Sequence, residues 1–480
     1  MSNAKTSILS SDYRSVTFSI LAATALVSYN NLSVSAASPE IGADLGSVGL
    51  LPWVITAELL ATAVAVLAIG PTVDGSGVRL VFRISMVTFI ISSFLCAIAN
   101  SMMMLIVFRV GQGLAAGGVV GTTVASIGLA YAPEARPKMY AAASGVWGAM
   151  GVGGPAVAAV LISVAGWRSI FVVTIPVGVV AAAIGWRRLP GKRDGTTAST
   201  FDRKGFIVVA TLTICLLIAA STTNRWAFAW LLAVAVLTAT YVRHARSIDA
   251  PVVRLDHLSG RRWRHVHLTS ALAIAGGTGA SAYLPLYLRA ARGASAGGAA
   301  FSVLFLVFGW TAGAFAASKL QERMDAAYVV RTGTRLLAAS VLATAVVVWL
   351  EWNLVFPLGS TMVAGFGIGA ISTSGLAILQ GRARPDEMGR VSAAHQFVRS
   401  LGWAYGAAIG GLVLFGVVAA RIGEIETVRD LLSSDDVALD SAAVDAVQAG
   451  YVWAVIVTGA MTAACLASAR QLVKNIGAFT

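Results

Sequence analysis

Charged residues are scarce in this sequence. Only 12% of its 480 residues are Asp, Glu, Lys or Arg, about half the share of a water-soluble globular protein. Hydrophobic residues make up 57%, and the mean hydropathy is +0.79. So much apolar surface cannot be hidden from water, and the composition therefore excludes both a soluble fold and a disordered chain.

Cysteine is also rare. The three cysteines, Cys96, Cys215 and Cys465, lie far apart in separate apolar runs, which argues against a disulfide framework and favours small core residues. The sequence shows no phosphate-binding loop, nucleophile elbow or cluster of metal ligands. We therefore expect a protein that is not an enzyme and that needs no metal or cofactor.

Long hydrophobic runs fill the chain. A helix that crosses a bilayer needs about 20 apolar residues. Fourteen segments meet this requirement and predict an all-helical integral membrane protein with 14 transmembrane helices. The predicted helices cover residues 17–37, 50–71, 80–100, 102–131, 139–165, 168–186, 205–223, 226–243, 266–288, 298–318, 326–350, 353–380, 391–418 and 447–469.

The order of these segments predicts two six-helix bundles separated by an inserted pair, because duplicated bundles are a common transporter architecture. Residues 1–190 would form the N-terminal six-helix bundle. Residues 191–245 would form a cytoplasmic linker and two inserted transmembrane helices. Residues 246–480 would form a second cytoplasmic linker and the C-terminal six-helix bundle.

The net charge of +13 is explained by membrane orientation rather than by nucleic-acid binding. Most of the 35 Lys and Arg residues lie in or beside the N-terminus, the even-numbered connections and the C-terminus. Cytoplasmic connections are rich in Lys and Arg, so both termini of this multi-pass cell-membrane protein are predicted to be cytoplasmic. The acidic connection 421–446 would then lie outside, where we predict a short amphipathic helix. The odd-numbered connections hold Arg168, Arg225, Arg289, Arg292, Arg421 and Arg429.

The first motif lies between the second and third predicted helices. The segment GPTVDGSGVRLVFR carries Gly70, Asp74, Gly77 and Arg79, and it resembles the helix 2–3 loop signature of the major facilitator superfamily. Asp74 lies at a helix end. It is predicted to cap the N-terminus of a neighbouring helix and to act as a latch on the cytoplasmic side.

Two further motifs lie on the fourth and fifth predicted helices. LIVFRVGQGLAAGG, with Arg109 and Gln112, resembles the helix 4 motif of this superfamily. GVGGPAVAAVL, with Gly154 and Pro155, resembles the helix 5 antiporter motif. Because proline removes one backbone donor, the Gly154–Pro155 step is expected to kink its helix.

Three longer stretches are similar to the 14-helix drug:proton antiporter family. They read WRSIFVVTIPVG (167–178), LPLYLR (284–289) and GRVSAAHQFVRSLGWAYGAAIGG (389–411). The resemblance implies a monomeric secondary transporter that exports an amphipathic organic compound, drug-like or a natural product, by alternating access. It also implies that the proton gradient supplies the energy.

The polar residues buried in the predicted helices are the candidates for coupling. Glu58 is the only acidic residue deep within a predicted span, and helical rise places it roughly 12 Å from the outer end. Arg109, Asn30 and Asn31 fall roughly 10–11 Å deep, at the same level. Burial favours the neutral form of a carboxyl group and a nearby arginine favours its charged form, so Glu58 is predicted to load and release a proton.

This sequence departs from the family that it resembles. The first helix of that family carries an acid where this chain has Asn30, and its second helix carries Tyr where this chain has Glu58. The acid has moved from the first helix to the second. Three other roles for Glu58 stay open: a static ion pair with Arg109, a counter-charge for a cationic cargo, and a gate in a lipid or metabolite exporter with altered or absent proton coupling. A transport-inactive scaffold is a fourth interpretation, which the retained Asp74 and Arg109 disfavour.

Other candidates complete the predicted site. Gln112 lies one turn from Arg109 and is predicted to share its hydrogen bonds. Arg399 matches a family position, and His395 shares its helix face. Aromatic residues are predicted to line a cavity for the cargo. They are Trp53, Trp147, Tyr283, Tyr287, Trp310 and Trp403.

Overall fold

The structure is a computed structural model that describes residues 7–11, 13–46, 50–192, 201–221, 226–422 and 441–474. Within these ranges every regular element is a helix, which confirms the predicted all-helical class. The helices fall into two compact units. Unit 1 comprises Met1–Leu216, Leu231–Gly260 and Leu379–Phe397, and unit 2 comprises Leu217–Trp230, Arg261–Ile378 and Val398–Thr480.

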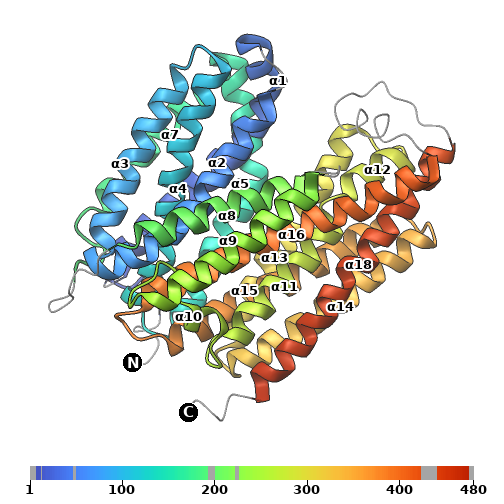
Figure 1. Cartoon of the computed structure of the whole chain (residues 1–480). Helices are drawn as coiled ribbons and strands as arrows, with labels where there is room; N and C mark the ends of the chain where they lie inside the picture. Colours follow the sequence, from blue (N-terminus) through green and yellow to red (C-terminus); the bar gives the residue numbers. More distant parts are fainter. Residues whose placement is uncertain are drawn as a thin grey trace. The chain divides into compact units, whose positions relative to one another are not determined.

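Unit 1 is built around α4, which packs against both α2 and α3, while α1 packs against α5 and α7 (Figure 1). The helices of unit 1 are α1 (Arg14–Leu45), α2 (Leu51–Ser76), α3 (Val78–Ala97), α4 (Met102–Ala130), α5 (Arg136–Ala165), α6 (Ser169–Val172), α7 (Thr174–Gly185) and α10 (Leu255–Ser259).

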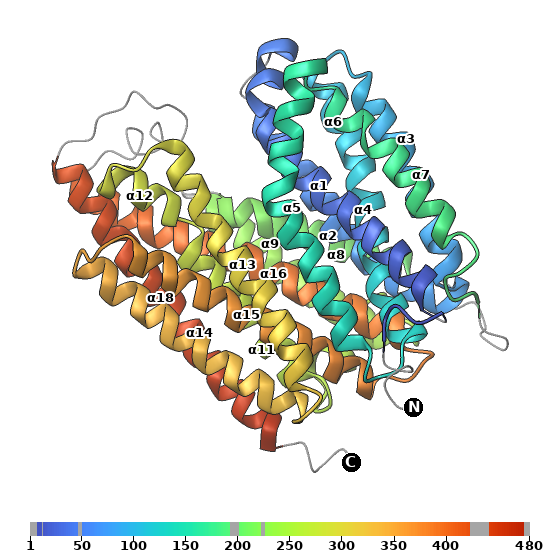
Figure 2. The same cartoon turned by 180° about the vertical axis from the view of Figure 1, so that it is seen from behind.

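In unit 2, α18 packs along both α11 and α14 (Figure 2). The helices of unit 2 are α11 (Arg264–Ser281), α12 (Leu284–Arg292), α13 (Ala296–Leu320), α14 (Ala326–Trp349) and α18 (Ser441–Lys474). Four helices have residues in both units: α8 (Arg203–Ser221), α9 (Trp226–Ser247), α15 (Val355–Arg382) and α16 (Met388–Ile422).

Ten described helices are long and apolar enough to cross a membrane. An eleventh, α1, qualifies if its segments Arg14–Val34 and Ala36–Leu45, bent by 42°, form one span. The predicted total of 14 is not reached: within the predicted segment 168–186, for example, the apolar helix Ser169–Gly185 is shorter than any of the ten spans. The helix predicted within 421–446 falls mostly on 423–440, outside the described residues.

Capping residues define where several helices begin and end. Gly77 has φ 82°, a left-handed conformation that favours glycine, and it separates α2 from α3. Ser101 accepts a hydrogen bond from Met104 N–H at the start of α4. Asp325 accepts one from Ala327 N–H at the start of α14. These caps satisfy backbone donors that a helix N-terminus leaves unpaired.

A stripe of glycines brings α4 against α2. A β-carbon on Gly113 would lie 2.3 Å from the carbonyl oxygen of Glu58, and one on Gly117 would lie 2.5 Å from that of Thr62. These positions have no room for a side chain, so the stripe packs as its four-residue spacing predicts. The close approach also fixes the distance between Glu58 and the side chains of α4.

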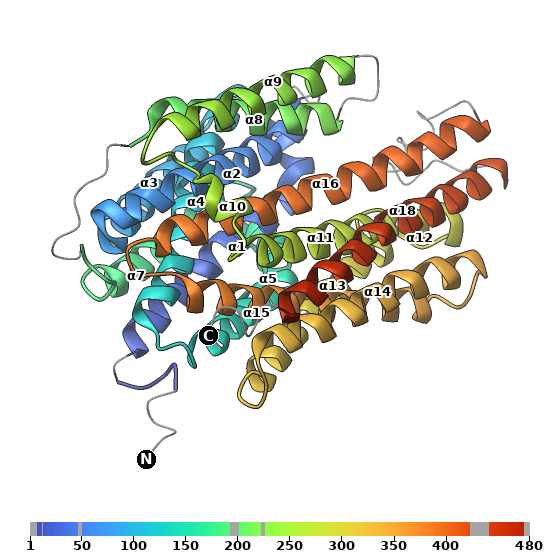
Figure 3. The same ribbon diagram turned by 60° about the horizontal axis from the view of Figure 1, so that its bottom comes forward.

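The α8–α9 pair lies side by side (Figure 3), and Asp202 links its ends. Asp202 Oδ1 lies 2.8 Å from His244 Nε2 and accepts from Gly205 N–H at 2.8 Å. Oδ2 accepts from Val252 N–H at 3.2 Å. Burial alone raises the pKa of the Asp202 carboxyl, but these hydrogen bonds outweigh it and the net pKa is lowered.

Candidate functional site

Arg109 is the centre of a buried polar cluster in unit 1. Its side chain is 1% exposed and uses all three of its nitrogen atoms. Nε donates to the Val54 carbonyl at 3.0 Å, and one terminal nitrogen donates to Asn30 Oδ1 at 3.2 Å and to Gln112 Oε1 at 2.6 Å. The other terminal nitrogen lies 3.4 Å from Glu58 Oε2. The structure thus brings together the residues that depth alone placed at one level.

Glu58 is 1% exposed. Besides Arg109, its carboxylate meets Asn31 and Thr62. In the amide orientation that satisfies both groups, Asn31 Nδ2 donates to Oε1 at 3.0 Å and to Oε2 at 3.1 Å. The Thr62 hydroxyl lies 3.5 Å from Oε1 and 3.1 Å from the Gly113 carbonyl. Both oxygens of the buried carboxylate therefore have partners.

Ser93 is a further member of this cluster that no motif in the sequence marks. Its hydroxyl accepts from Gln112 Nε2 at 2.8 Å, which fixes Oε1 of the amide toward Arg109. The available signal in the sequence is the serine pair Ser92–Ser93 within the apolar second half of α3. The network thus draws on four helices, α1 to α4.

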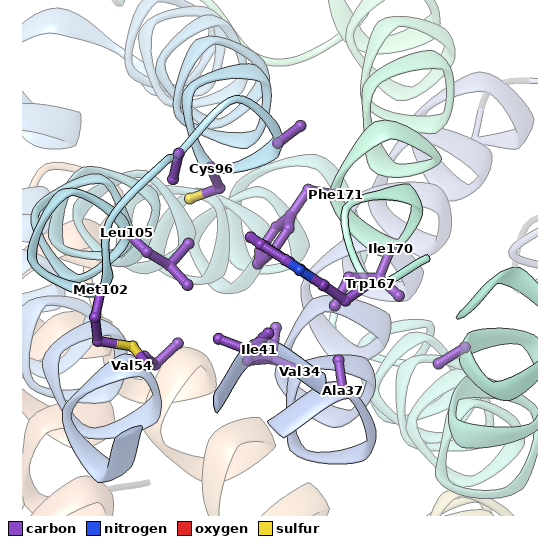
Figure 4. Close-up of a cluster of buried hydrophobic side chains, with 13 residues drawn as sticks. Val34, Ala37, Ile41, Val54, Cys96, Met102, Leu105, Trp167, Ile170 and Phe171 are labelled. Carbon is purple, nitrogen blue, oxygen red and sulfur yellow. The ribbon is translucent and has the colours of Figure 1, made fainter. Parts of the chain in front are cut away.

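An apolar cluster lies next to the network. Val54 contributes its carbonyl oxygen to the network as an acceptor and its side chain to this cluster, and Cys96 lies 3.8 Å from Gln112 Oε1. Figure 4 shows these side chains gathered with the rings of Trp167 and Phe171, whose centroids are 6.1 Å apart. The apolar cluster keeps the ion pair in a low-dielectric surrounding, where electrostatic interactions are strong. Its buried members are Val34, Ala37, Ile41, Val54, Cys96, Ala97, Ala99, Met102, Leu105, Ala158, Trp167, Ile170 and Phe171.

The arrangement keeps Arg109 hydrogen-bonded in either protonation state of Glu58. If Glu58 gains a proton, the ion pair is lost, but the Val54 carbonyl, Asn30 and Gln112 still accept from the guanidinium. Neutral acceptors therefore lower the cost of leaving a charge buried without its counter-charge. Asn30 Nδ2 is buried and has no hydrogen-bond partner among the described residues, so one donor of the cluster is unused.

Asp74 lies at the N-terminus of α16, as a cap should. Oδ1 accepts from Gly389 N–H at 2.7 Å, and Oδ2 accepts from Arg390 N–H at 3.0 Å. Oδ2 also lies 3.5 Å from the Arg390 guanidinium. The carboxylate therefore satisfies two free donors of the first turn and complements the positive end of the helix dipole. All of these atoms belong to unit 1.

The other residues of the helix 2–3 motif support the same region. A β-carbon on Gly70 would lie 2.8 Å from the β-carbon of Ala393, so glycine lets α2 approach α16. A β-carbon on Gly77 would lie 2.5 Å from Lys192 N. Arg79 donates from Nε to the Leu189 carbonyl at 2.8 Å. The motif thus anchors the α2–α3 turn to the chain that follows α7.

Arg136 and Gln380 form a second contact in this region that the sequence did not reveal. Arg136 donates to the Gly128 carbonyl at 2.8 Å and to the Gln380 carbonyl at 2.9 Å. Gln380 Nε2 donates to the Val124 carbonyl at 2.9 Å. An arginine at the C-terminal carbonyls of α4 also complements the negative end of that helix. No local pattern marks Gln380, because its partners lie about 250 residues away in the chain.

Gly154 and Pro155 lie inside α5, which is assigned as one continuous helix from Arg136 to Ala165. A β-carbon on Gly154 would lie 3.6 Å from Leu32 Cβ, an ordinary contact, so space alone does not require glycine there.

Arg399 lies on α16 in unit 2, whereas His395 is buried on the part of α16 in unit 1.

The predicted aromatic residues occupy different surroundings. In unit 2 the rings of Trp310 and Trp403 are stacked with centroids 6.0 Å apart, and Trp403 is exposed. Tyr287 is fully buried and stacks on Tyr451. Tyr283 donates from its hydroxyl to the Ala407 carbonyl. In unit 1, Trp53 and Trp147 are exposed.

Comparisons with known proteins identify relatives of this chain among multidrug transporters. The chain is 24% identical to the multidrug transporter protein MdtP of Bacillus subtilis, covering 82% of this chain and 73% of that protein. It is 24% identical to the multidrug efflux pump SdrM of Staphylococcus aureus, covering 79% and 84%. It is 27% identical to a multidrug resistance protein B homolog of Mycobacterium tuberculosis, covering 79% and 72%.

Solved structures share the fold at low sequence identity. The human organic anion transporter TETRAN superposes with a TM-score of 0.64 at 13% identity, covering 95% of this chain and 99% of that one. The fucose:proton symporter FucP of Escherichia coli superposes with a TM-score of 0.62 at 11% identity, covering 96% and 98%. The sequence profile of the Major Facilitator Superfamily matches residues 18–407. This chain therefore belongs to the major facilitator superfamily, a family of multi-pass membrane transporters.

Proposed function

We propose that this protein is a proton-coupled exporter of amphipathic organic compounds and that Glu58 carries the coupling proton. The observation that carries the proposal is the buried contact of Glu58 with Arg109, at 3.4 Å, inside a cluster that can keep Arg109 hydrogen-bonded when Glu58 is neutral. Burying a carboxylate and an arginine inside a membrane costs free energy, and such residues therefore usually mark a functional site. The multidrug efflux pumps among the relatives support a drug-like cargo.

The same proposal extends to the architecture. The chain would belong to the 14-helix drug:proton antiporter family, with α6–α7, α8 and α9 as spans in addition to the eleven segments above. Residues 1–190, 191–245 and 246–480 would form the three parts predicted from the sequence. The contact of Asp74 with the first turn of α16 would act as the latch of the alternating-access cycle, and Trp310 and Trp403 would contact the cargo.

Flux in reconstituted liposomes tests the proposed function. We expect a pH gradient, acidic on the side that is outside in the cell, to drive efflux of a fluorescent amphipathic dye such as ethidium. Dissipating the gradient with a protonophore should stop the accumulation of dye against its own gradient. Efflux at the same rate with and without the pH gradient would favour the alternative, an exporter of lipids or metabolites without proton coupling.

The proposed orientation is tested by labelling single cysteines in intact cells. A cysteine placed within 421–446 should react with a membrane-impermeant maleimide added outside. A cysteine placed within 187–204 should react only after the membrane is opened. The opposite pattern would contradict the assignment of both termini to the cytoplasm, because that assignment rests on the distribution of Lys and Arg.

A further inference from the structure

Four cationic side chains line one groove at the ends of α14 and α18. Arg331 and Arg335 come from the beginning of α14, and Arg470 and Lys474 from the end of α18. The groove has a volume of about 490 Å³ and contains no acidic residue in its lining. Its other lining residues are Ala467, Gln471 and Val473.

The two helices that form this groove are packed along their length in opposite directions. Near the other end of the pair, Gln448 Nε2 donates to Glu351 Oε1 at 2.9 Å. Between the two ends, a β-carbon on Gly459 would lie 3.5 Å from Val341 Cγ1. Figures 1 and 2 show α14 and α18 side by side from both directions. The groove is therefore part of a helix pair within unit 2 and not of a loop.

The charge of the groove is uncompensated in the described part of the chain. None of its four cations makes a hydrogen bond or ion pair with a described carboxylate. Arg335, Arg470 and Lys474 are exposed, and Arg331 is half-buried. Four like charges around one groove repel one another, so a bound anion with several oxygen atoms would relieve this repulsion and satisfy several donors at once.

The surface next to the groove is apolar. On α14, Arg335 continues an exposed face that carries Leu342 and Val346. On α18, the exposed residues that lead to Lys474 are the apolar Ala460, Ala463, Ala464 and Ala467. In a membrane protein such faces contact lipid chains. The groove therefore lies where a lipid headgroup would be found when its acyl chains cover these faces.

We propose that this groove binds the phosphate group of an anionic phospholipid. The arginine guanidinium presents parallel N–H donors that match phosphate oxygens, and Lys474 adds a compact charge. Basic pockets between transmembrane helices at the cytoplasmic surface are suited to such headgroups, and the predicted orientation assigns this end of α14 and α18 to the cytoplasm. The inference is independent of the role of Glu58.

Lipid binding to the purified full chain tests the proposal. We expect native mass spectrometry to show phosphatidylglycerol retained in preference to phosphatidylcholine. In the double variant Arg335→Gln/Arg470→Gln, the affinity for phosphatidylglycerol should fall roughly 25-fold, because each cation near the surface contributes about fivefold. Both side chains are exposed, so the variant should fold, and its elution profile in detergent checks this.

The matched control is Arg187→Gln/Arg188→Gln, which removes the same charge from two exposed arginines of unit 1 on the same predicted side. This control should retain phosphatidylglycerol as the wild type does. An equal loss in the control, or full retention in the groove variant, would overturn the proposal. Inorganic phosphate provides a further test. The lipid assignment is wrong, and the occupant is a soluble anion, if phosphate raises the thermal midpoint of the wild type as much as phosphatidylglycerol does. In that case phosphate should not raise the midpoint of the groove variant.

Discussion

Glu58→Gln is expected to reduce gradient-driven export to the level of protein-free liposomes while leaving cargo binding in place. Glutamine keeps the size of the side chain and one acceptor oxygen, but it cannot take up and release a proton. The substitution removes one charge-assisted contact with Arg109, a loss of about 1.5–3 kcal/mol. Arg109 keeps three neutral acceptors, so we expect the variant to fold. Parallel measurements of pH-driven efflux and of gradient-free exchange of the same dye separate coupling from binding.

A second variant moves the acid back to α1. Asn30 Oδ1 already accepts from Arg109 at 3.2 Å, so Asn30→Asp would place a carboxylate on the same guanidinium. The double variant Asn30→Asp/Glu58→Gln should therefore recover part of the gradient-driven efflux. Thr62→Val is the matched control. It removes a long contact with Glu58, at 3.5 Å, and a hydrogen bond to the Gly113 carbonyl, but it leaves the carboxylate and its contact with Arg109 in place, so coupling should stay nearly unchanged.

The alternative roles of Glu58 give different results. If Glu58 is a counter-charge for a cationic cargo, Glu58→Gln should weaken the binding of cationic dyes and spare neutral ones. If Glu58 only pairs with Arg109, the double variant Glu58→Gln/Arg109→Gln should restore activity that each single variant loses. Arg109→Gln alone leaves a buried carboxylate without its counter-charge, which typically costs about 3–5 kcal/mol.

Asp74→Asn is expected to have the second-largest effect, a strong fall in transport with normal membrane insertion. The carboxylate accepts from two adjacent backbone donors, Gly389 N–H and Arg390 N–H. An asparagine would turn its own N–H₂ toward one of them, so one hydrogen bond and the charge at the helix N-terminus are lost. The contact between α2 and α16 should lose about 1–2 kcal/mol, which shifts the equilibrium between the states with and without this contact roughly 5- to 30-fold.

Asp386→Asn provides the control for this variant. Asp386 lies two residues before α16 and is exposed, with its only described ion pair to a similarly exposed Arg384. The same chemical change there should leave transport intact. If Asp74→Asn supports wild-type efflux, or if Asp386→Asn lowers it equally, the contact of Asp74 with α16 has no special role in the cycle.

The membrane makes the members of the polar cluster predictable from the sequence. In a chain this apolar, each polar residue inside a span is rare, and helical rise gives its depth. Depth alone therefore assigns Glu58, Arg109 and Asn30 to one level of the bundle. It does not determine how they pair, because pairing depends on how each helix is rotated about its axis. The structure shows that Asn31, rather than Asn30, contacts the carboxylate.

Other parts of the fold depend on contacts between distant residues and leave no local pattern. The sequence predicts the cap formed by Asp74 but not its partners, Gly389 and Arg390, which lie 315 and 316 residues away. Hydropathy predicts the apolar segment 168–186 but not the interruption between α6 and α7 at Val173, because Val173 is as apolar as its neighbours. The basic groove is also invisible in the sequence, since its cations come together only when α14 and α18 pack.

Proton exchange on cargo binding is the most direct test of the role of Glu58. A pH indicator in a weakly buffered solution of purified protein in detergent can count the protons released when a saturating cationic dye binds. We expect the wild type to release protons and Glu58→Gln to release none, with dye binding retained in both. Equal proton release by the wild type and by Glu58→Gln would contradict the assignment of the coupling proton to Glu58.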